Sequence, residues 1–406
     1  MKRLLLLSNG HGEDLSGALL ARELQRLGST VEALPLVGHG HAYRQAGIPV
    51  LGHTREYSTG GLGYTSLRGR LTELRQGQLA YLLGRLARLL RSRHDLIVVV
   101  GDVLPLLGAW LSGRPSVIYL VAYSSHYEGR LRLPWPCGWL LRRRRSLRVW
   151  SRDALTASDL SEQLGRTVEF LGNPFLDPVA RPPAPISGHA RQTLGLLPGS
   201  RLPEAERNLA LMLAMLERLP EALAEPGRLA LQAALVDDLQ PGALARMAAP
   251  LGWRLETGQG DADGQAPQVL VRGLLRLQLH WRRFAAVLHG SDLLVSMTGT
   301  AAEQAVGLGK PVLQLEGEGP QFTPGFAEAQ RRLLGPGVLC APPGPEHLAA
   351  GAALAVSLLQ RLSAEESGVR WRQELAQLGR ERIGSPGGTA RQAAAIMESL
   401  PSSSGR

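Results

Sequence analysis

The chain has 406 residues, of which 44% are hydrophobic and 20% charged, and its formal net charge is +10. This composition supplies enough apolar material for two ordinary cores and excludes a chain that is disordered throughout. The two cysteines, Cys137 and Cys340, lie far apart and outside any CxxC or Cys/His spacing, so neither a disulfide framework nor a structural zinc site is indicated.

Arginine dominates the basic residues. Only Lys2 and Lys310 are lysines, so 45 minus 2 leaves 43 arginines. A basic balance favours anionic partners, namely nucleotide phosphates, lipid headgroups or nucleic acid. The segment Met1–Leu7 is too short for a signal-peptide core, and the longest apolar region, 96–123, is interrupted by an aspartate, a proline and an arginine. We therefore expect a cytoplasmic protein without a spanning helix, whose membrane contact is peripheral.

Short apolar runs alternate with segments of helical spacing along the first half of the chain. Expected strands lie at 3–7, 31–36, 96–100 and 117–121, and expected helices at 15–27 and 79–90. The alternation restarts after residue 190, with expected strands at 192–197, 229–236, 292–296 and 311–315 and helices at 204–219 and 301–308. This order predicts parallel sheets covered by helices.

A proline-rich segment, DPVARPPAP at 177–185, separates the two halves and cannot hold a regular helix or a central strand. We expect an N-terminal domain over 1–177, a linker over 178–190 and a C-terminal domain over 191–400, whose last helix can pack back on the first domain. The predicted fold is α/β, with two Rossmann-like domains facing a central cleft. Ligands are expected at the carboxyl ends of the strands.

The first glycine loop, Ser8–Gly17, follows an expected strand and opens an expected helix, so its backbone N–H groups can meet an anionic or polar ligand. It lacks the GxGxxG spacing of dinucleotide sites. One interpretation is a tight turn in which Asp14 caps the helix. We favour a binding loop, because His11, Glu13 and Asp14 together exceed the polarity that a turn requires.

Asp102 follows the all-apolar strand 96–100 and a glycine, which places a carboxylate at the carboxyl end of a buried strand. Burial tends to raise the pKa of a carboxyl, and this suits a general base that deprotonates a hydroxyl. Alternatively, Asp102 caps a helix that starts near Pro105, since proline is favoured in a first helical turn.

Two glycine loops of the second half can present donors to a diphosphate. The first contains Gly199, Ser200 and Arg201, and the second contains Thr298, Gly299 and Thr300. The Arg201 guanidinium suits bidentate phosphate contact, and the second loop opens a helix. Thr300 and Glu303 match a capping box, so Glu303 either satisfies the helix end or contacts a ribose, and these roles do not exclude each other.

In their order and spacing, these motifs resemble lipid-A-disaccharide synthase, and more closely the lipid-A-disaccharide synthase-related proteins. The resemblance covers the chain up to about residue 320. The motifs that carry it are 9–20, Gly-Asp-Val at 101–103, LGNPFLD at 171–177, LPGSR at 197–201 with Glu204, and TGTAAE at 298–303.

The resemblance implies a B-type glycosyltransferase fold in which the C-terminal domain holds a UDP-sugar. Arg201 and the Thr298–Thr300 loop would contact the diphosphate, Glu303 would contact the ribose, and Asp102 would be the base. No metal and no cofactor beyond the donor are implied, because arginine and helix N-termini can neutralise the leaving diphosphate, and no DxD-type carboxylate pair is placed to bind a divalent ion.

The first loop departs from the Gly-Glu-Ala-Ser-Gly-Asp pattern of the family. Its candidate acceptor-contacting residues are Asn9, Gly10, Gly12, Glu13 and Asp14. His11 resembles the histidine in the first glycine loop of the lipid-II-forming N-acetylglucosaminyltransferase and is a second candidate base. Gln321, within GPQFT at 319–323, resembles a donor-contacting residue of that enzyme.

Two arginine-rich segments suggest a membrane surface. The expected helix 79–90 carries leucines on one face and arginines on much of the rest, which fits either a membrane-surface helix or an ordinary covering helix with a solvated face. Residues 131–145 combine two tryptophans with four consecutive arginines, a mixture typical of a headgroup interface. We expect an anionic membrane surface as partner and no nucleic acid.

The sequence thus predicts a UDP-sugar-dependent hexosyltransferase that acts on a lipid-like hydroxyl at the inner face of the cytoplasmic membrane. The resemblance suggests an acylated glucosamine as the donor sugar. A UDP-sugar 2-epimerase shares the fold and the nucleotide site, and a non-catalytic basic protein of the membrane surface that retains the fold is a third interpretation.

Overall fold

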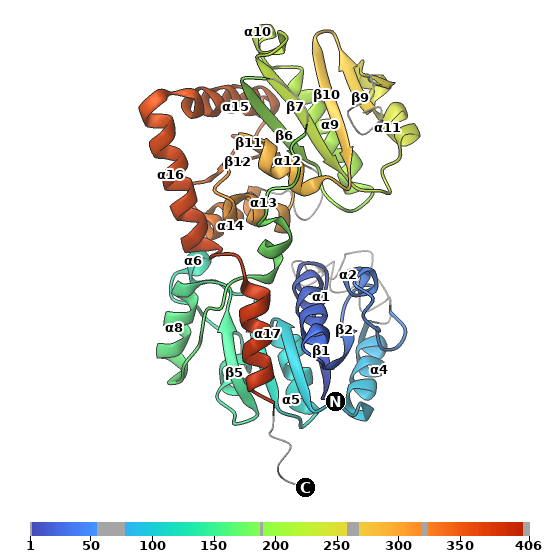
Figure 1. Ribbon diagram of the computed structural model, residues 1–406, viewed down its shortest axis with the longest axis vertical. Coiled ribbons are helices and arrows are strands. Elements are labelled where there is room, and N and C mark those ends of the chain that lie inside the picture. Colours follow the sequence, from blue (N-terminus) through green and yellow to red (C-terminus); the bar gives the residue numbers. More distant parts are fainter. Residues whose placement is uncertain (1, 55–77, 187–189, 258–267, 318–323, 401–406) are drawn as a thin grey trace. The chain divides into compact units, whose positions relative to one another are not determined.

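The computed structural model describes residues 2–54, 78–186, 190–257, 268–317 and 324–400. The chain divides into two compact units, Met1–Asp177 with Gly384–Arg406, and Pro178–Ile383. The first boundary falls after Asp177, where the proline-rich segment begins. The second unit ends at Ile383 rather than near residue 400, because the last helix belongs to the first unit (Figure 1).

The first unit is built on a parallel sheet with the strand order β2-β1-β3-β4-β5. Its strands are β1 (Arg3–Ser8), β2 (Thr30–Pro35), β3 (Leu96–Gly101), β4 (Ser116–Leu120) and β5 (Ser146–Ser151). The strands predicted at 3–7, 31–36, 96–100 and 117–121 are confirmed, each within one residue or so. Because β1 and β3 are neighbours in the sheet, the loops that follow them lie at the same edge.

Two apolar layers cover the two faces of this sheet. Leu4 and Leu6 belong to one buried cluster and Leu5 and Leu7 to the other, as the two-residue period of a strand requires. The helices are α1 (His11–Arg26), α2 (His41–Gln45), α4 (Gln78–Arg91), α5 (Val103–Leu111), α6 (Ser125–Glu128), α7 (Cys137–Leu141), α8 (Ala154–Leu164) and α17 (Gly388–Glu398). A sheet buried on both faces explains why its strands read as continuous apolar runs.

Helix α17 returns from the end of the chain and packs beside α1 on the first face (Figure 1). It buries Ala393 and Ile396 there. Its first turn is held by Asp177, whose carboxylate accepts hydrogen bonds from the backbone N–H groups of Gly387 and Thr389, the latter at 2.8 Å. The aspartate of the LGNPFLD motif therefore fastens the last helix.

The second unit carries a larger sheet with the order β13-β12-β11-β6-β7-β10-β9-β8. Its strands are β6 (Gln192–Leu197), β7 (Leu229–Leu235), β8 (Arg254–Thr257), β9 (Gln268–Arg272), β10 (Leu275–Trp281), β11 (Leu293–Ser296), β12 (Val312–Gln314) and β13 (Val338–Cys340). The sheet is parallel from β13 to β10, while β9 and β8 extend it in antiparallel fashion. The four strands predicted here are confirmed.

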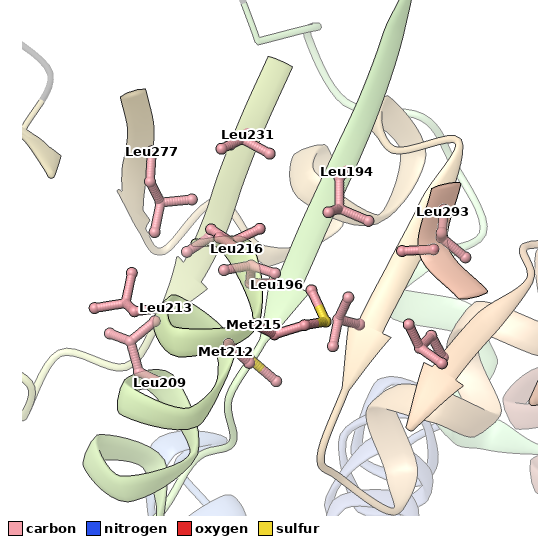
Figure 2. Packing of buried hydrophobic residues seen from close by; sticks show 14 of the residues in the cluster. Leu194, Leu196, Leu209, Met212, Leu213, Met215, Leu216, Leu231, Leu277 and Leu293 are labelled. Carbon is pink, nitrogen blue, oxygen red and sulfur yellow. The ribbon is translucent and has the colours of Figure 1, made fainter. Parts of the chain in front are cut away.

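The helices of the second unit cover both faces of that sheet, as Figure 1 shows. They are α9 (Glu204–Leu216), α10 (Glu221–Ala224), α11 (Pro241–Ala248), α12 (Phe284–Gly290), α13 (Thr300–Gly307), α14 (Pro324–Leu334), α15 (His347–Ser363) and α16 (Glu365–Arg382). On one face, α9 presents Leu209, Met212, Leu213 and Leu216 to the leucines of β6, β7, β10 and β11 (Figure 2). Among the described residues of either unit, no helix combines the length and apolarity needed to cross a bilayer.

Helix α4 does not present all its arginines to solvent. The Arg85 side chain is buried and donates to the backbone carbonyls of Pro35 and Leu51, the latter at 2.5 Å. Leu83 and Leu90 are instead exposed. The expectation of a solvated arginine face is therefore wrong for Arg85, because its guanidinium satisfies backbone carbonyls at the end of β2 and near residue 51.

Candidate functional site

Asp102 stands at the carboxyl edge of the first sheet, directly after β3. One carboxylate oxygen accepts the backbone N–H of Leu104 at 2.9 Å, so Asp102 caps α5 as one interpretation of the sequence predicted. The other oxygen accepts a hydrogen bond at 2.8 Å from the side-chain amide of Asn9, which lies in the loop after β1. Burial raises the pKa of Asp102 from its ordinary value, and the bonds from Leu104 and Asn9 partly offset that rise.

A glycine lets these two loops approach. Gly101 has φ 149°, and a Cβ built on it would lie 3.1 Å from Pro105 Cγ and 3.4 Å from the Asn9 Cβ. A side chain here would crowd Pro105, and residues other than glycine rarely adopt this φ. Glycine at 101 therefore suits the close approach of the two loops.

The first loop is a helix N-terminus. Helix α1 begins at His11, and Gly10 precedes it with φ 130° and no side-chain cap. Gly12 and Glu13 lie half-buried in the first turn, while the structure describes only the backbone of His11. Asp14 does not cap the helix as one interpretation held: its backbone N–H already bonds to the carbonyl of Gly10, so it lies within the first turn.

The Asp14 side chain is buried in the first unit. Its carboxyl accepts the Ser8 hydroxyl at 2.6 Å, and Ser8 accepts the Tyr43 hydroxyl at 3.0 Å. All three side chains are buried. Burial is the main cause that raises the pKa of Asp14 to about 7, against the Ser8 bond and the positive charge of Arg85, which lower it. Hydrogen bonds from Tyr43 to Ser8 and from Ser8 to Asp14 therefore tie the first turn of α1 to the core of the first unit.

This carboxyl predicts a pH-dependent stability. Between pH 3.8 and about 7 the unfolded chain ionises Asp14 while the folded chain keeps it protonated. Folding therefore loses stability as the pH rises through this window, by about 4 kcal/mol in total for this one group. Asp14→Asn cannot ionise and retains an oxygen for the Ser8 bond, so we expect it to be more stable than wild type at neutral pH and nearly equal near pH 4.

Urea unfolding of both proteins at about pH 4.5 and about pH 7.5 measures this difference. Glu13→Gln, one residue earlier and only half-buried, is the control and should keep the pH dependence of wild type. If Asp14→Asn follows the same pH profile as wild type, Asp14 does not carry the raised pKa.

A second polar group at this edge was missed by the sequence reasoning. Asp153 is fully buried, caps α8 through the N–H of Thr156 at 2.7 Å, and accepts the Ser124 hydroxyl at 2.8 Å. The His126 Nε2 atom lies 3.8 Å from the same carboxylate. These residues follow β4 and β5, and the signal that could have found them is the aspartate that comes just after β5.

The second unit brings its two predicted loops together. Strands β6 and β11 are parallel neighbours, and the Met297 N–H donates to the Leu197 carbonyl at 3.2 Å just beyond them. A Cβ built on Gly199, which has φ 124°, would lie 3.9 Å from Thr298 Cγ2. The two loops therefore lie close to each other at the carboxyl edge, with Ser200 exposed and Arg201 half-buried in the first of them.

Helix α13 begins at Thr300, and Gly299 is its N-cap without a side-chain hydrogen bond. The predicted capping box of Thr300 and Glu303 is therefore wrong, because the helix begins one residue too early for Thr300 to be the cap. The Glu303 side chain is half-buried on the first turn. Gln321, the remaining predicted contact, lies outside the described residues.

No known family model matches the chain, and no curated protein matches it. Solved structures match along its whole length. The calicheamicin glycosyltransferase CalG4 is 17% identical and has a TM-score of 0.60, with 100% of both chains covered. The spinosyn rhamnosyltransferase SpnG, complexed with thymidine diphosphate, is 15% identical, with a TM-score of 0.57 over 98% of this chain and 100% of its own.

A protein of Listeria monocytogenes assigned as a UDP-N-acetylglucosamine 2-epimerase is 15% identical, with a TM-score of 0.53 over 98% of this chain and 96% of its own. Likeness at these identities shows a common architecture. The chain has the B-type glycosyltransferase fold, an α/β fold with two Rossmann-like domains.

Proposed function

We propose that the protein is a glycosyltransferase that moves a sugar from a UDP-sugar to a hydroxyl of a lipid-like acceptor, as a peripheral protein at the inner face of the cytoplasmic membrane. The observation that carries the proposal is Asp102, a half-buried carboxylate with a raised pKa, held by Asn9 at the carboxyl edge of the first sheet. A base in this state is suited to accept a proton from a hydroxyl.

In the proposed reaction, the acceptor hydroxyl oxygen attacks the anomeric carbon of the donor. Asp102 takes the hydroxyl proton as the new carbon–oxygen bond forms, and the bond between the anomeric carbon and the diphosphate oxygen breaks, so UDP leaves with the electron pair. Asn9 keeps one oxygen of Asp102 oriented during this step. Attack opposite the leaving group inverts the anomeric centre. His11 is the second candidate for the base.

The second unit would hold the donor. The backbone N–H groups at the start of α13, next to Gly299, point where a diphosphate can bind. Arg201 in the adjoining loop would add a charge-assisted contact, and Glu303 would bind the ribose. No metal or other cofactor is part of the proposal. The choice of UDP follows from the resemblance to lipid-A-disaccharide synthase, and SpnG was solved with a related nucleoside diphosphate.

A UDP-sugar 2-epimerase is the second candidate, favoured by the similarity to the Listeria protein. An epimerase gives an epimer of the sugar, free or joined to UDP, whereas a transferase gives a glycosylated acceptor together with free UDP. The nature of the product therefore separates the two candidates.

A thermal-shift panel of nucleotides and nucleotide sugars tests the proposal, since a ligand that binds only the folded protein raises its melting temperature. We expect UDP and at least one UDP-sugar to raise it, and free sugars to have no effect. No shift with any nucleotide would contradict an enzyme of either kind and favour a non-catalytic protein that retains the fold.

A further inference from the structure

The first unit exposes an aromatic cluster beside α7. Trp135 is 90% exposed, and Trp139 and Leu111 are 42% and 44% exposed. The Trp139 ring meets the Trp110 ring edge-on, with 5.3 Å between centroids, so α7 and the end of α5 form one surface. Single exposed apolar residues are common on soluble proteins, but several of them on, or just before, two helices that pack together indicate a binding surface.

Arginines adjoin this cluster. The side chains of Arg142, Arg143, Arg144 and Arg145 are all exposed at the end of α7. The Arg143 guanidinium lies 3.8 Å from the centre of the Trp139 ring, and Arg142 donates to the Gln163 carbonyl at 2.6 Å. Among the described residues, no ion pair with a carboxylate is found for these four arginines. The positive charge of these four arginines is therefore available to an anionic partner.

We propose that this surface, formed by Trp135, Trp139, Leu111 and Arg142–Arg145 and here called the Trp/Arg surface, docks the protein on a bilayer of anionic phospholipid. Tryptophan rings favour the depth of the lipid headgroups, and exposed arginines are attracted to anionic headgroups beside them. Nucleic acid would use the arginines and could stack a base on a tryptophan ring, but it would leave Leu111 without an apolar environment. The inference deepens the proposed function, on which it rests for the lipid-like acceptor.

Cosedimentation with vesicles tests the surface directly. We expect wild type to bind vesicles of equal parts phosphatidylglycerol and phosphatidylcholine, and to bind phosphatidylcholine alone much more weakly. The double variant Arg143→Gln/Arg144→Gln should lower the partition coefficient by about 30-fold, since each arginine near the surface contributes about a fivefold factor. Trp135→Ser should lower it by about tenfold on both kinds of vesicle. Trp135 is so exposed that its replacement leaves the core intact.

Matched controls separate this surface from general charge and apolarity. Arg246→Gln/Arg370→Gln removes two exposed charges of the second unit, and Leu274→Ser removes an exposed leucine of the same unit. All three substitutions should leave vesicle binding within about twofold of wild type. The inference is overturned if wild type ignores anionic vesicles, if the surface variants bind like wild type, or if the controls lose as much binding as the surface variants.

A nucleotide-binding assay on the same variants keeps the two proposals apart. The Trp/Arg surface variants should retain the thermal shift with UDP, because that site is assigned to the second unit. Vesicle binding without any nucleotide binding would contradict the transferase and leave the docking surface standing. Nucleotide binding without vesicle binding would contradict the docking surface and leave the transferase proposal standing. Tighter binding of wild type to duplex DNA or RNA than to anionic vesicles, through the same arginines, would also overturn it.

Discussion

Replacing Asp102 by asparagine is expected to lower turnover by about 10² to 10⁴-fold, the range that a general base contributes. Asparagine is a good N-cap and can still accept the Leu104 N–H, so the helix end that Asp102 caps is preserved. The affinity for UDP should remain near that of wild type. The measurement is the rate of UDP release with the donor that the thermal-shift panel selects, at a pH where Asp102 is ionised.

Asp95→Asn is the matched control for this variant. Asp95 lies at the amino end of β3 and accepts the Arg3 backbone N–H at 2.8 Å, whereas Asp102 follows the carboxyl end of the same strand. The control should keep turnover within a factor of about two to three, as expected for a substitution outside the site. Turnover of Asp102→Asn close to wild type would remove Asp102 from the base role and transfer it to His11.

Arg201→Ala is expected to weaken UDP binding by about 10 to 100-fold, because a hydrogen bond to a charged group contributes about 1.5 to 3 kcal/mol. Its loop lies close to Thr298, in the loop that opens α13. Titration calorimetry of UDP into wild type and variant measures the change. Uridine, which lacks the diphosphate, should bind both proteins equally.

Arg218→Ala provides the control for that titration, since Arg218 is exposed just beyond the opposite end of α9. Its UDP affinity should match that of wild type. Equal affinity of Arg201→Ala and wild type would mean that the diphosphate is not bound at this loop.

Much of this fold could be predicted from the sequence, because buried parallel strands leave continuous apolar runs. Strands such as β3, LIVVVG, are unmistakable for this reason. Strand β5, SLRVWS, escaped notice because it lies at the edge of the sheet and alternates polar with apolar residues. Strands β8 and β9 were also not predicted, and β10 follows β9 after a short turn without an intervening helix.

The sequence predicted those residues of the candidate site that directly follow a strand. Asn9 and Asp102 were each placed after a strand, and the pairing of β1 with β3 brings them into contact. Side-chain direction was not predictable, because it depends on tertiary packing. Asp14 was predicted to contact the acceptor or to cap α1, whereas its side chain is buried and accepts a hydrogen bond from Ser8. Arg85 was predicted to face solvent, and its side chain is buried as well. His126 and Asp153 were missed together with β5.

Transfer to a lipid-like hydroxyl can be tested by incubating the protein with a labelled UDP-sugar and a membrane lipid extract. We expect UDP to be released and the labelled sugar to enter the organic phase, and we expect Asp102→Asn to lose both effects. Sugar that is epimerised while still joined to UDP, or label that never reaches the organic phase although UDP-sugar is bound, would contradict transfer to a lipid-like hydroxyl.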